Sequence, residues 1–404
     1  MRISLHHNAR AARRGPYPFQ ATLSADRAEL AFAEISRCPL YAPTPLADLP
    51  LAAERNGVRR VIYKDEGPRF GLHSFKALGG AYAVARLLSD QLSARLDRPV
   101  GPADLVRRDH AGGAAAVTVA CASDGNHGRS VAAGAKAFGC ACVIFLHEGV
   151  SAGREAAVTA LGAQVVRTPG DYDASVLIAR ETSAARGWTL VSDTAQSADD
   201  PVPAMVLQGY SVMMLELQTQ LDTMAERTPT HVFLQGGVGG LAAAVVAQLW
   251  ESLGPEQAPI FVVVEPERAD CLYQSAVAGR PTPASGDLET LMAGLACGEV
   301  SQVAWPILAA GVEFFMTIPD EAAVEAMRLL ADGALGAPPI VAGESAVAGL
   351  AALLAAGRAE ESRRRLRLDA DSLVLLIGSE GATDPEIWRR LVGDERADRL
   401  GIAA

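Results

Sequence analysis

The sequence has few aromatic residues and no long, uninterrupted apolar segment. Phe, Trp and Tyr make up 5% of its 404 residues, although 50% are hydrophobic. No apolar run reaches the roughly 20 residues that a membrane-spanning helix needs. The basic N-terminal segment, residues 1–14, lacks the apolar core of a secretory signal. We therefore expect a soluble, cytoplasmic protein without a membrane partner.

Cysteine is sparse, and positive charge is in deficit. The six cysteines are scattered, with no CxxC pair and no zinc-like spacing, which predicts reduced thiols and no metal site. The chain carries 47 Asp and Glu residues against 36 Lys and Arg residues, for a net charge of -11. This balance argues against nucleic acid or an anionic membrane as the main partner.

Apolar strands alternate with amphipathic helices along most of the chain. This pattern predicts an α/β protein with two domains, each an open, twisted, mostly parallel sheet flanked by helices. We assign residues 85–203 to a small domain, and residues 1–84 and 204–404 to a large domain. Residues 98–116, rich in proline, arginine and aspartate, are expected to form a surface excursion. One long helix is expected at residues 205–221.

The stretch from Tyr63 to Gly80 joins a predicted strand to a predicted helix. Ser74 is a plausible N-cap of that helix, which places Lys76 in its first turn. The positive end of a helix dipole disfavours a cation there. An amine whose charged form is disfavoured is closer to the neutral nucleophile that imine formation requires. Lys76 is thus a candidate nucleophile, although an ordinary surface lysine explains this stretch equally well.

A glycine-rich segment lies between a predicted strand at residues 231–234 and a predicted helix at residues 242–250. Its sequence is Gln235-Gly236-Gly237-Val238-Gly239-Gly240-Leu241. Backbone N–H groups can converge on an anion at such a helix N-terminus. The segment is not a Walker loop, because no Gly-Lys-Ser/Thr follows. We favour an anion site here over a turn that merely allows close helix–strand packing.

Three other polar positions each follow a predicted strand. They are the loop Ser123-Asp124-Gly125-Asn126-His127-Gly128, Asp193 after the strand expected at residues 188–192, and Ser379 after the strand expected at residues 373–377. Open α/β sheets bind ligands at the carboxyl ends of their strands. Asp193 could instead be a turn or cap residue, and Ser379 a strand-end turn. His127 is expected to be a structural partner of its loop rather than a base.

Several of these motifs resemble a known family. The lysine stretch resembles that of fold-type II pyridoxal-phosphate enzymes, and Arg69-Phe70-Gly71 with Ser74-Phe75-Lys76 is similar to their diaminopropionate ammonia-lyase branch. The resemblance runs from Pro43 to about Asp384, with the motifs in the same order. It also includes Gly343-Glu344-Ser345, where Glu344 could approach the cofactor ring or cap a helix at residues 345–356; we favour the cap.

The resemblance implies a cofactor, pyridoxal 5'-phosphate, and a set of residues that hold it. Lys76 would bind the cofactor aldehyde, and the backbone of Gly236, Gly237, Val238, Gly239 and Gly240 would hold its phosphate. Asn126 would contact the 3-hydroxyl, and Ser379 would face the pyridine nitrogen. A neutral hydroxyl makes the ring a weaker electron sink than a carboxylate does, which suits elimination rather than transamination.

The resemblance also implies an activity, the α,β-elimination of D- or L-2,3-diaminopropionate to pyruvate and ammonia. Lys76 would remove the α-proton of the L-isomer and Asp124 that of the D-isomer, with Asp193 assisting. Two carboxylates suit a substrate with a β-ammonium group. A serine, threonine or hydroxyaspartate dehydratase of the same fold is the alternative, and a catalytically silent cofactor-binding protein is a further one. A homodimer is expected from the family.

Overall fold

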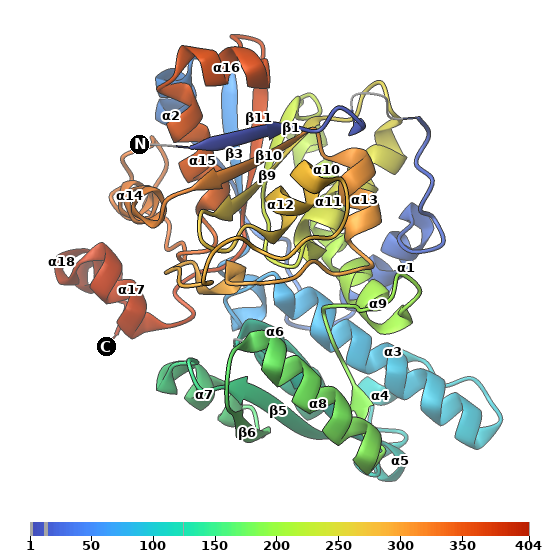
Figure 1. Ribbon diagram of the computed structural model, residues 1–404. Coiled ribbons are helices and arrows are strands. Elements are labelled where there is room, and N and C mark those ends of the chain that lie inside the picture. Colours follow the sequence, from blue (N-terminus) through green and yellow to red (C-terminus); the bar gives the residue numbers. More distant parts are fainter. Residues whose placement is uncertain (1–2, 12–14, 124, 404) are drawn as a thin grey trace.

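The computed structural model describes residues 3–11, 15–123 and 125–403 (Figure 1). Its strands form two sheets, one seven-stranded with the order β1-β10-β9-β8-β11-β3-β2 and one four-stranded with the order β6-β5-β4-β7. The strands of the larger sheet are β1 (Ser4–His7), β2 (Leu46–Asp48), β3 (Arg60–Asp65), β8 (His231–Gln235), β9 (Ile260–Pro266), β10 (Phe314–Ile318) and β11 (Leu373–Gly378). Those of the smaller sheet are β4 (Thr118–Ala122), β5 (Ala141–His147), β6 (Gln164–Thr168) and β7 (Thr189–Leu190).

Helices surround both sheets. In the first half of the chain they are α1 (Ala25–Ile35), α2 (Pro50–Asn56), α3 (Lys76–Leu96), α4 (Pro102–Val106), α5 (Ala111–Ala115), α6 (Asn126–Phe138), α7 (Ala152–Thr159) and α8 (Tyr172–Arg186). In the second half they are α9 (Pro201–Tyr210), α10 (Val212–Thr223), α11 (Gly240–Leu253), α12 (Cys271–Ala278), α13 (Trp305–Gly311), α14 (Asp320–Ala331), α15 (Ala348–Gly357), α16 (Glu360–Leu366), α17 (Pro385–Val392) and α18 (Asp394–Arg399). Within the described residues, no helix combines the length and apolar character needed to cross a membrane.

The larger sheet is parallel in its centre and antiparallel at both edges, where β1 pairs with β10 and β2 pairs with β3. Its central strands are buried on both faces, since their successive side chains point to opposite sides and nearly all of them are buried. Along β11, Leu373 and Leu375 belong to the apolar cluster that contains α11, whereas Val374 and Leu376 belong to the cluster that contains α15. Because an apolar cluster covers each face of the sheet, both sets of side chains are buried, which explains the near-continuous apolar runs in these strands.

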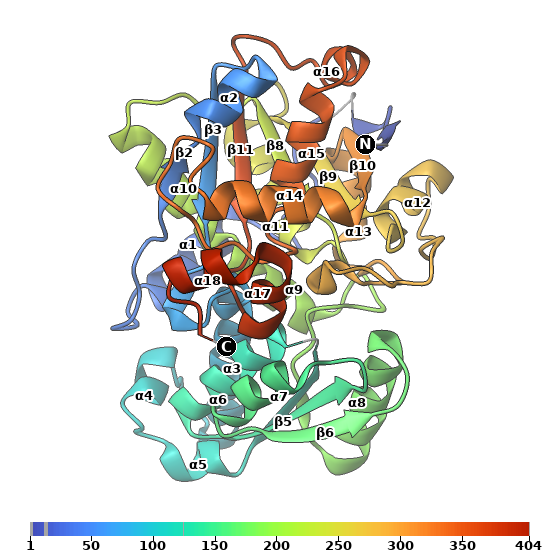
Figure 2. The ribbon, with the colours of Figure 1, turned by 90° about the vertical axis from the view of Figure 1, so that its left-hand side faces the viewer.

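The smaller sheet is parallel throughout. It lies at the bottom of Figures 1 and 2, and α6 and α8 pack against it. We call each sheet with the helices that cover it a layer. Helix α3 packs on α6 of the smaller layer and on α9 of the larger one, and so connects the two. Residues 98–116 hold α4 and α5, two short helices. The predicted domain limit between residues 84 and 85 falls inside α3, and the division into two domains stays a prediction.

Two predicted helices differ from the structure. The helix expected at residues 205–221 is two helices, α9 and α10, that meet at Ser211. The break lies near Gly209, where the backbone approaches α3 so closely that a Cβ would come within 2.6 Å of the Leu78 carbonyl oxygen. The helix expected at residues 345–356 begins only at Ala348, because residues 343–346 are held by tertiary contacts instead.

Candidate functional site

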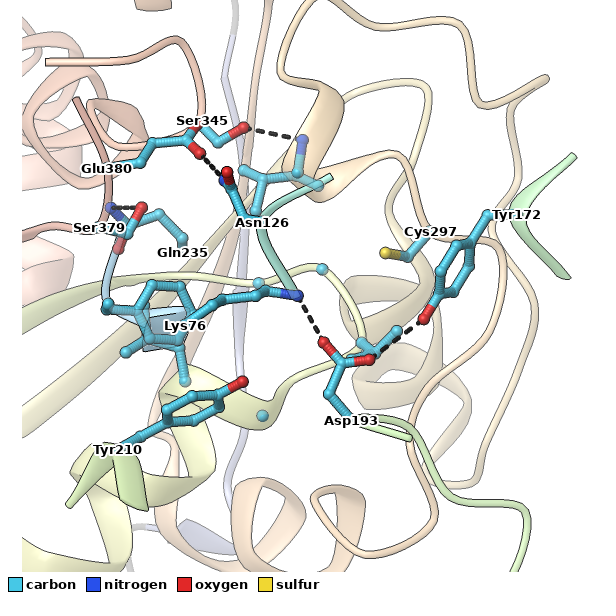
Figure 3. Close-up of a pocket in the computed structure, with 18 residues that line it drawn as sticks. Lys76, Asn126, Tyr172, Asp193, Tyr210, Gln235, Cys297, Ser345, Ser379 and Glu380 are labelled. Carbon is cyan, nitrogen blue, oxygen red and sulfur yellow. Dashed lines mark hydrogen bonds and ion pairs between the residues drawn. The ribbon is translucent and has the colours of Figure 1, made fainter. Parts of the chain in front are cut away.

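A pocket lies where the carboxyl ends of strands from both sheets meet (Figure 3). Asn126 follows β4, Asp193 follows β7, Gly236 follows β8 and Ser379 follows β11. Lys76 enters from the start of α3. The pocket is lined by Phe75, Lys76, Asn126, Tyr172, Asp193, Tyr210, Gln235, Gly236, Gly237, Val238, Gly240, Leu241, Gly294, Leu295, Cys297, Ser345, Ser379 and Glu380. Residues far apart in the sequence therefore converge at the edge where open α/β sheets bind ligands.

The Lys76 amine contacts a carboxylate from the smaller layer. Its Nζ lies 2.5 Å from Oδ2 of Asp193. Burial opposes the charged form, but Asp193 outweighs that effect and raises the pKa of Lys76. Contrary to the expectation from the helix dipole, the contact with Asp193 favours the ammonium of Lys76. The helix dipole is a weaker influence than a carboxylate in direct contact.

The predicted N-cap also shifts by one position. Helix α3 begins at Lys76 itself, and Phe75 occupies the N-cap position without a capping side chain. Ser74 lies just before it and still contributes, since its Oγ accepts a hydrogen bond from the Lys76 backbone N–H at 3.3 Å.

Two further side chains lie beside Asp193. Tyr172 donates its hydroxyl to Oδ1 at 3.3 Å, and Nδ1 of His127 lies 3.9 Å from Oδ2. Burial alone would raise the pKa of Asp193, but His127 and Lys76 lower it, so the carboxylate is charged. The buried His127 ring donates from Nε2 to the Val191 carbonyl at 2.8 Å. This contact joins the loop to the next strand, the structural role that the sequence favoured.

The glycine turn before α11 is shaped by close packing. A Cβ on Gly236 would meet Cγ of Glu265 at 2.4 Å, and one on Gly239 would meet Cδ1 of Leu308 at 2.8 Å. Gly237 and Gly239 also have φ values of +65° and +98°, which side chains other than hydrogen rarely allow. The turn thus brings its glycine backbone to the pocket at the start of a 14-residue helix. This cradle fits a phosphate group.

Polar contacts on the opposite wall connect the two layers. Asn126 donates from Nδ2 to Glu380 Oε2, and Arg154 donates from Nη2 to Glu344 Oε1 at 2.8 Å. Glu344 is therefore not a helix cap, as the sequence suggested, but half of a buried ion pair. Burial, followed by the nearby Glu380 charge, raises the pKa of Glu344 to about 7. Ser379 lines the same wall.

A buried ionic network holds the loop that leads to Lys76. Arg69 binds Glu66 through Nε at 2.7 Å and Glu216 through Nη1 at 2.7 Å. Lys64, at the end of β3, binds Glu216 at 2.8 Å. These side chains are at most 1% exposed. Removing one partner would leave a buried charge uncompensated, so the network fixes the path of the chain from β3 to α3.

The structure brings most of the predicted site residues together. Lys76, Asn126, Asp193, Ser379 and the glycine turn share one pocket, and Gly239 lies within the turn without lining it. Asp124 falls outside the described residues. Sequence reasoning missed Tyr172 and Tyr210, because single tyrosines in helices carry no local signal of a site. Among the described residues, no cluster of His, Cys, Asp and Glu could hold a metal ion.

Comparisons with known proteins agree with the observed fold. Residues 38–378 match the family described as pyridoxal-phosphate dependent enzyme, and the chain belongs to that family. Its sheets and helices are those of the fold-type II class, as the sequence predicted. The cofactor of this class is pyridoxal phosphate.

Sequence and structure comparisons identify the branch of this class to which the chain belongs. The diaminopropionate ammonia-lyase of Salmonella typhimurium is 37% identical over 89% of this chain and 90% of its own length, and that of Escherichia coli K12 is 37% identical over 87% of each. The E. coli enzyme in complex with D-serine superimposes with a TM-score of 0.87 at 33% identity, covering 98% of this chain and 97% of that one. Within the class, the chain therefore belongs to the diaminopropionate ammonia-lyase family.

Proposed function

We propose that this protein eliminates ammonia from 2,3-diaminopropionate and yields pyruvate. The contact between Lys76 and Asp193 carries the proposal, because it places an amine beside a charged carboxylate in a pocket that ends at an anion cradle. A substrate with a second amine needs such a negative partner. A solved structure of the E. coli relative is described as a complex with an aminoacrylate-PLP azomethine reaction intermediate, which supports elimination chemistry.

Each site residue has a proposed task. Pyridoxal phosphate, when bound, supplies an aldehyde for the substrate's α-amine and a ring that withdraws electrons from the α-carbon. Lys76 would hold the aldehyde, and the glycine turn, residues 236–240, would hold the phosphate. Asn126 would bind the 3-hydroxyl, and Ser379 would face the ring nitrogen.

The proton and the leaving group follow a simple path. For the L-isomer, the freed amine of Lys76 takes the proton from the α-carbon, and Asp193 stabilises the resulting ammonium. The bond between the β-carbon and its nitrogen breaks with its electron pair on nitrogen, and ammonia leaves. The released 2-aminoacrylate reacts with water to give pyruvate and a second ammonia. Asp124, outside the described residues, serves as the base for the D-isomer.

A dehydratase of the same fold is not favoured. The L-threonine dehydratase of Pasteurella multocida is 29% identical over 59% of this chain and only 39% of its own length. The two carboxylates expected near the substrate, Asp124 and Asp193, also suit a β-ammonium leaving group better than a neutral hydroxyl. We further propose that the protein is a cytoplasmic homodimer with a large domain of residues 1–84 and 204–404 and a small domain of residues 85–203.

A substrate panel tests this function. Purified, cofactor-loaded protein is given D- and L-2,3-diaminopropionate, serine, threonine and hydroxyaspartate, and 2-oxo acid and ammonia are measured. We expect two ammonia molecules per pyruvate from diaminopropionate and much slower turnover of the hydroxy amino acids. Lys76→Ala should abolish turnover and the visible absorbance of the bound aldehyde. Faster turnover of a hydroxy amino acid would overturn the proposal.

A further inference from the structure

Tyr210, the last residue of α9, lies between the two helix starts that build the pocket. Its ring packs edge-on against Phe75, with 4.7 Å between the ring centroids. A Cβ on Gly79, in the first turn of α3, would meet its Cε1 at 2.4 Å, and one on Gly240, the first residue of α11, would lie 3.8 Å from its Cε2. Gly79 thus makes room for this ring beside Lys76, and the ring lies next to the first residue of the helix that follows the glycine turn.

The hydroxyl of Tyr210 has no protein partner among the described residues. Tyr210 is 1% exposed, yet it lines the pocket, and its hydroxyl oxygen is buried without a hydrogen bond. Figure 3 shows this hydroxyl directed into the pocket on the side of the Lys76 amine. Buried polar groups are nearly always paired, and an unpaired one costs about 1–3 kcal/mol. Because Tyr210 also lines the pocket, the missing partner of its hydroxyl is expected to belong to a bound group.

We propose that the Tyr210 hydroxyl donates a hydrogen bond to the phosphate of the cofactor. The phosphate is the end of the cofactor that rests on the turn before α11, and the Tyr210 ring lies against the first residue of that helix. The partners of the 3-hydroxyl and of the ring nitrogen, Asn126 and Ser379, follow other strands. Burial strongly raises the pKa of Tyr210, so the hydroxyl keeps its proton and can donate a hydrogen bond to an anion. The proposal rests on the cofactor and is independent of the substrate.

Comparing two aldehydes isolates the phosphate contact. Apo-protein is titrated with pyridoxal phosphate and with pyridoxal, which lacks the phosphate, and binding is followed by visible absorbance. In Tyr210→Phe we expect pyridoxal phosphate to bind about ten- to a hundredfold more weakly, as for loss of a hydrogen bond to a charged group. Pyridoxal should bind as it does to the unaltered protein, which also shows that the variant is folded.

Tyr17→Phe is the matched control. Tyr17 is also buried with an unpaired hydroxyl among the described residues, but it packs on Trp250, away from the pocket. Its variant should bind both aldehydes unchanged. An equal loss for both aldehydes in Tyr210→Phe would place the hydroxyl elsewhere and overturn the proposal, as would unchanged affinity for both. Neither result would bear on which amino acid is the substrate, because no turnover is measured.

Discussion

At the scale of single residues, the charge on Lys76 depends on a partner from a distant part of the chain. Asp193 lies 117 positions away in sequence and 2.5 Å away in space. It stabilises the ammonium, although imine formation needs the neutral amine. The same carboxylate would hold the proton on Lys76 once the amine has taken it from the substrate. A single contact thus affects both cofactor attachment and catalysis.

Asp193→Asn is expected to lower the pKa of Lys76. Without the anion, burial acts alone and favours the neutral amine, so the fraction of free amine at a given pH should rise by about tenfold or more. The measurement is the rate at which pyridoxal attaches to the apo-protein as a function of pH. The variant's profile should level off at a lower pH than that of the unaltered protein.

Tyr172→Phe is the control for this prediction. It removes the hydroxyl that contacts the other oxygen of Asp193 but keeps the carboxylate charge. Its attachment profile should stay close to that of the unaltered protein. If Asp193→Asn also left the profile unchanged, another group would set the charge of Lys76.

At the scale of elements, the turn before α11 is fixed by its neighbours. The buried Glu265 side chain lies against Gly236, and its carboxylate accepts the backbone N–H groups of Leu272 at 3.0 Å and Tyr273 at 2.7 Å. Glu265 is therefore tied to the start of α12 and cannot move aside. A turn with so little room keeps its backbone in one position, which suits a preformed anion cradle.

Gly236→Ala should damage both stability and cofactor binding. The added methyl would overlap Glu265, and overpacking of this kind costs about 1–3 kcal/mol of the free energy of unfolding. Displacement of the turn should weaken binding of pyridoxal phosphate. Urea unfolding and absorbance titration measure the two effects.

Gly112→Ala provides the matched substitution. A Cβ at Gly112, in α5, would meet no atom within 4 Å. Alanine favours helix over glycine, so this variant should lose neither stability nor cofactor affinity. A Gly236→Ala protein that behaved in the same way would show that the turn can relax and that its close packing is unimportant.

Elements with strong local patterns were predictable, and those set by contacts were not. The apolar run at β11 and the glycines before α11 predicted these elements correctly. A strand buried on two faces and a helix N-terminus each leave a local pattern in the sequence. The start of α15 did not follow its pattern, since Ser345 accepts the Gly294 N–H at 3.0 Å and Glu344 pairs with Arg154. Such partners come from remote segments.

At the scale of the whole molecule, polar contacts join the two layers around the pocket. Arg154 of α7 binds Glu344, Ser151 donates to Asp384, and Asn126 of α6 donates to Glu380. In each pair, one residue belongs to a segment of the smaller layer and the other to a loop of the larger one. These contacts therefore hold the smaller layer against the pocket wall.

Stability should depend on pH through Glu344. Its pKa of about 7 in the folded protein exceeds the ordinary value of 4.5, so the folded state binds this proton more tightly than the unfolded state. The free energy of unfolding should therefore fall as pH rises from about 4.5 to 7, by up to about 3 kcal/mol. Glu344→Gln cannot titrate and should show a shallower decline in urea unfolding across this range.

Glu325→Gln is the control. Glu325 pairs with an arginine, Arg358, as Glu344 does, but it lies at the surface. Its replacement by Gln is therefore the same chemical change at an exposed position. Its variant should keep the pH dependence of the unaltered protein. A Glu344→Gln protein whose stability curve ran parallel to that of the unaltered protein would exclude Glu344 as the source of the dependence.

The sequence by itself determined the α/β class, the buried strands and the motifs that resemble the ammonia-lyases, because these depend on local order and periodicity. Only the tertiary structure decided the charge on Lys76, the pairing of Glu344 and the place of Tyr210 in the pocket. Ion pairs, burial and hydrogen bonds depend on distance in space, and a linear pattern does not record which remote side chains meet.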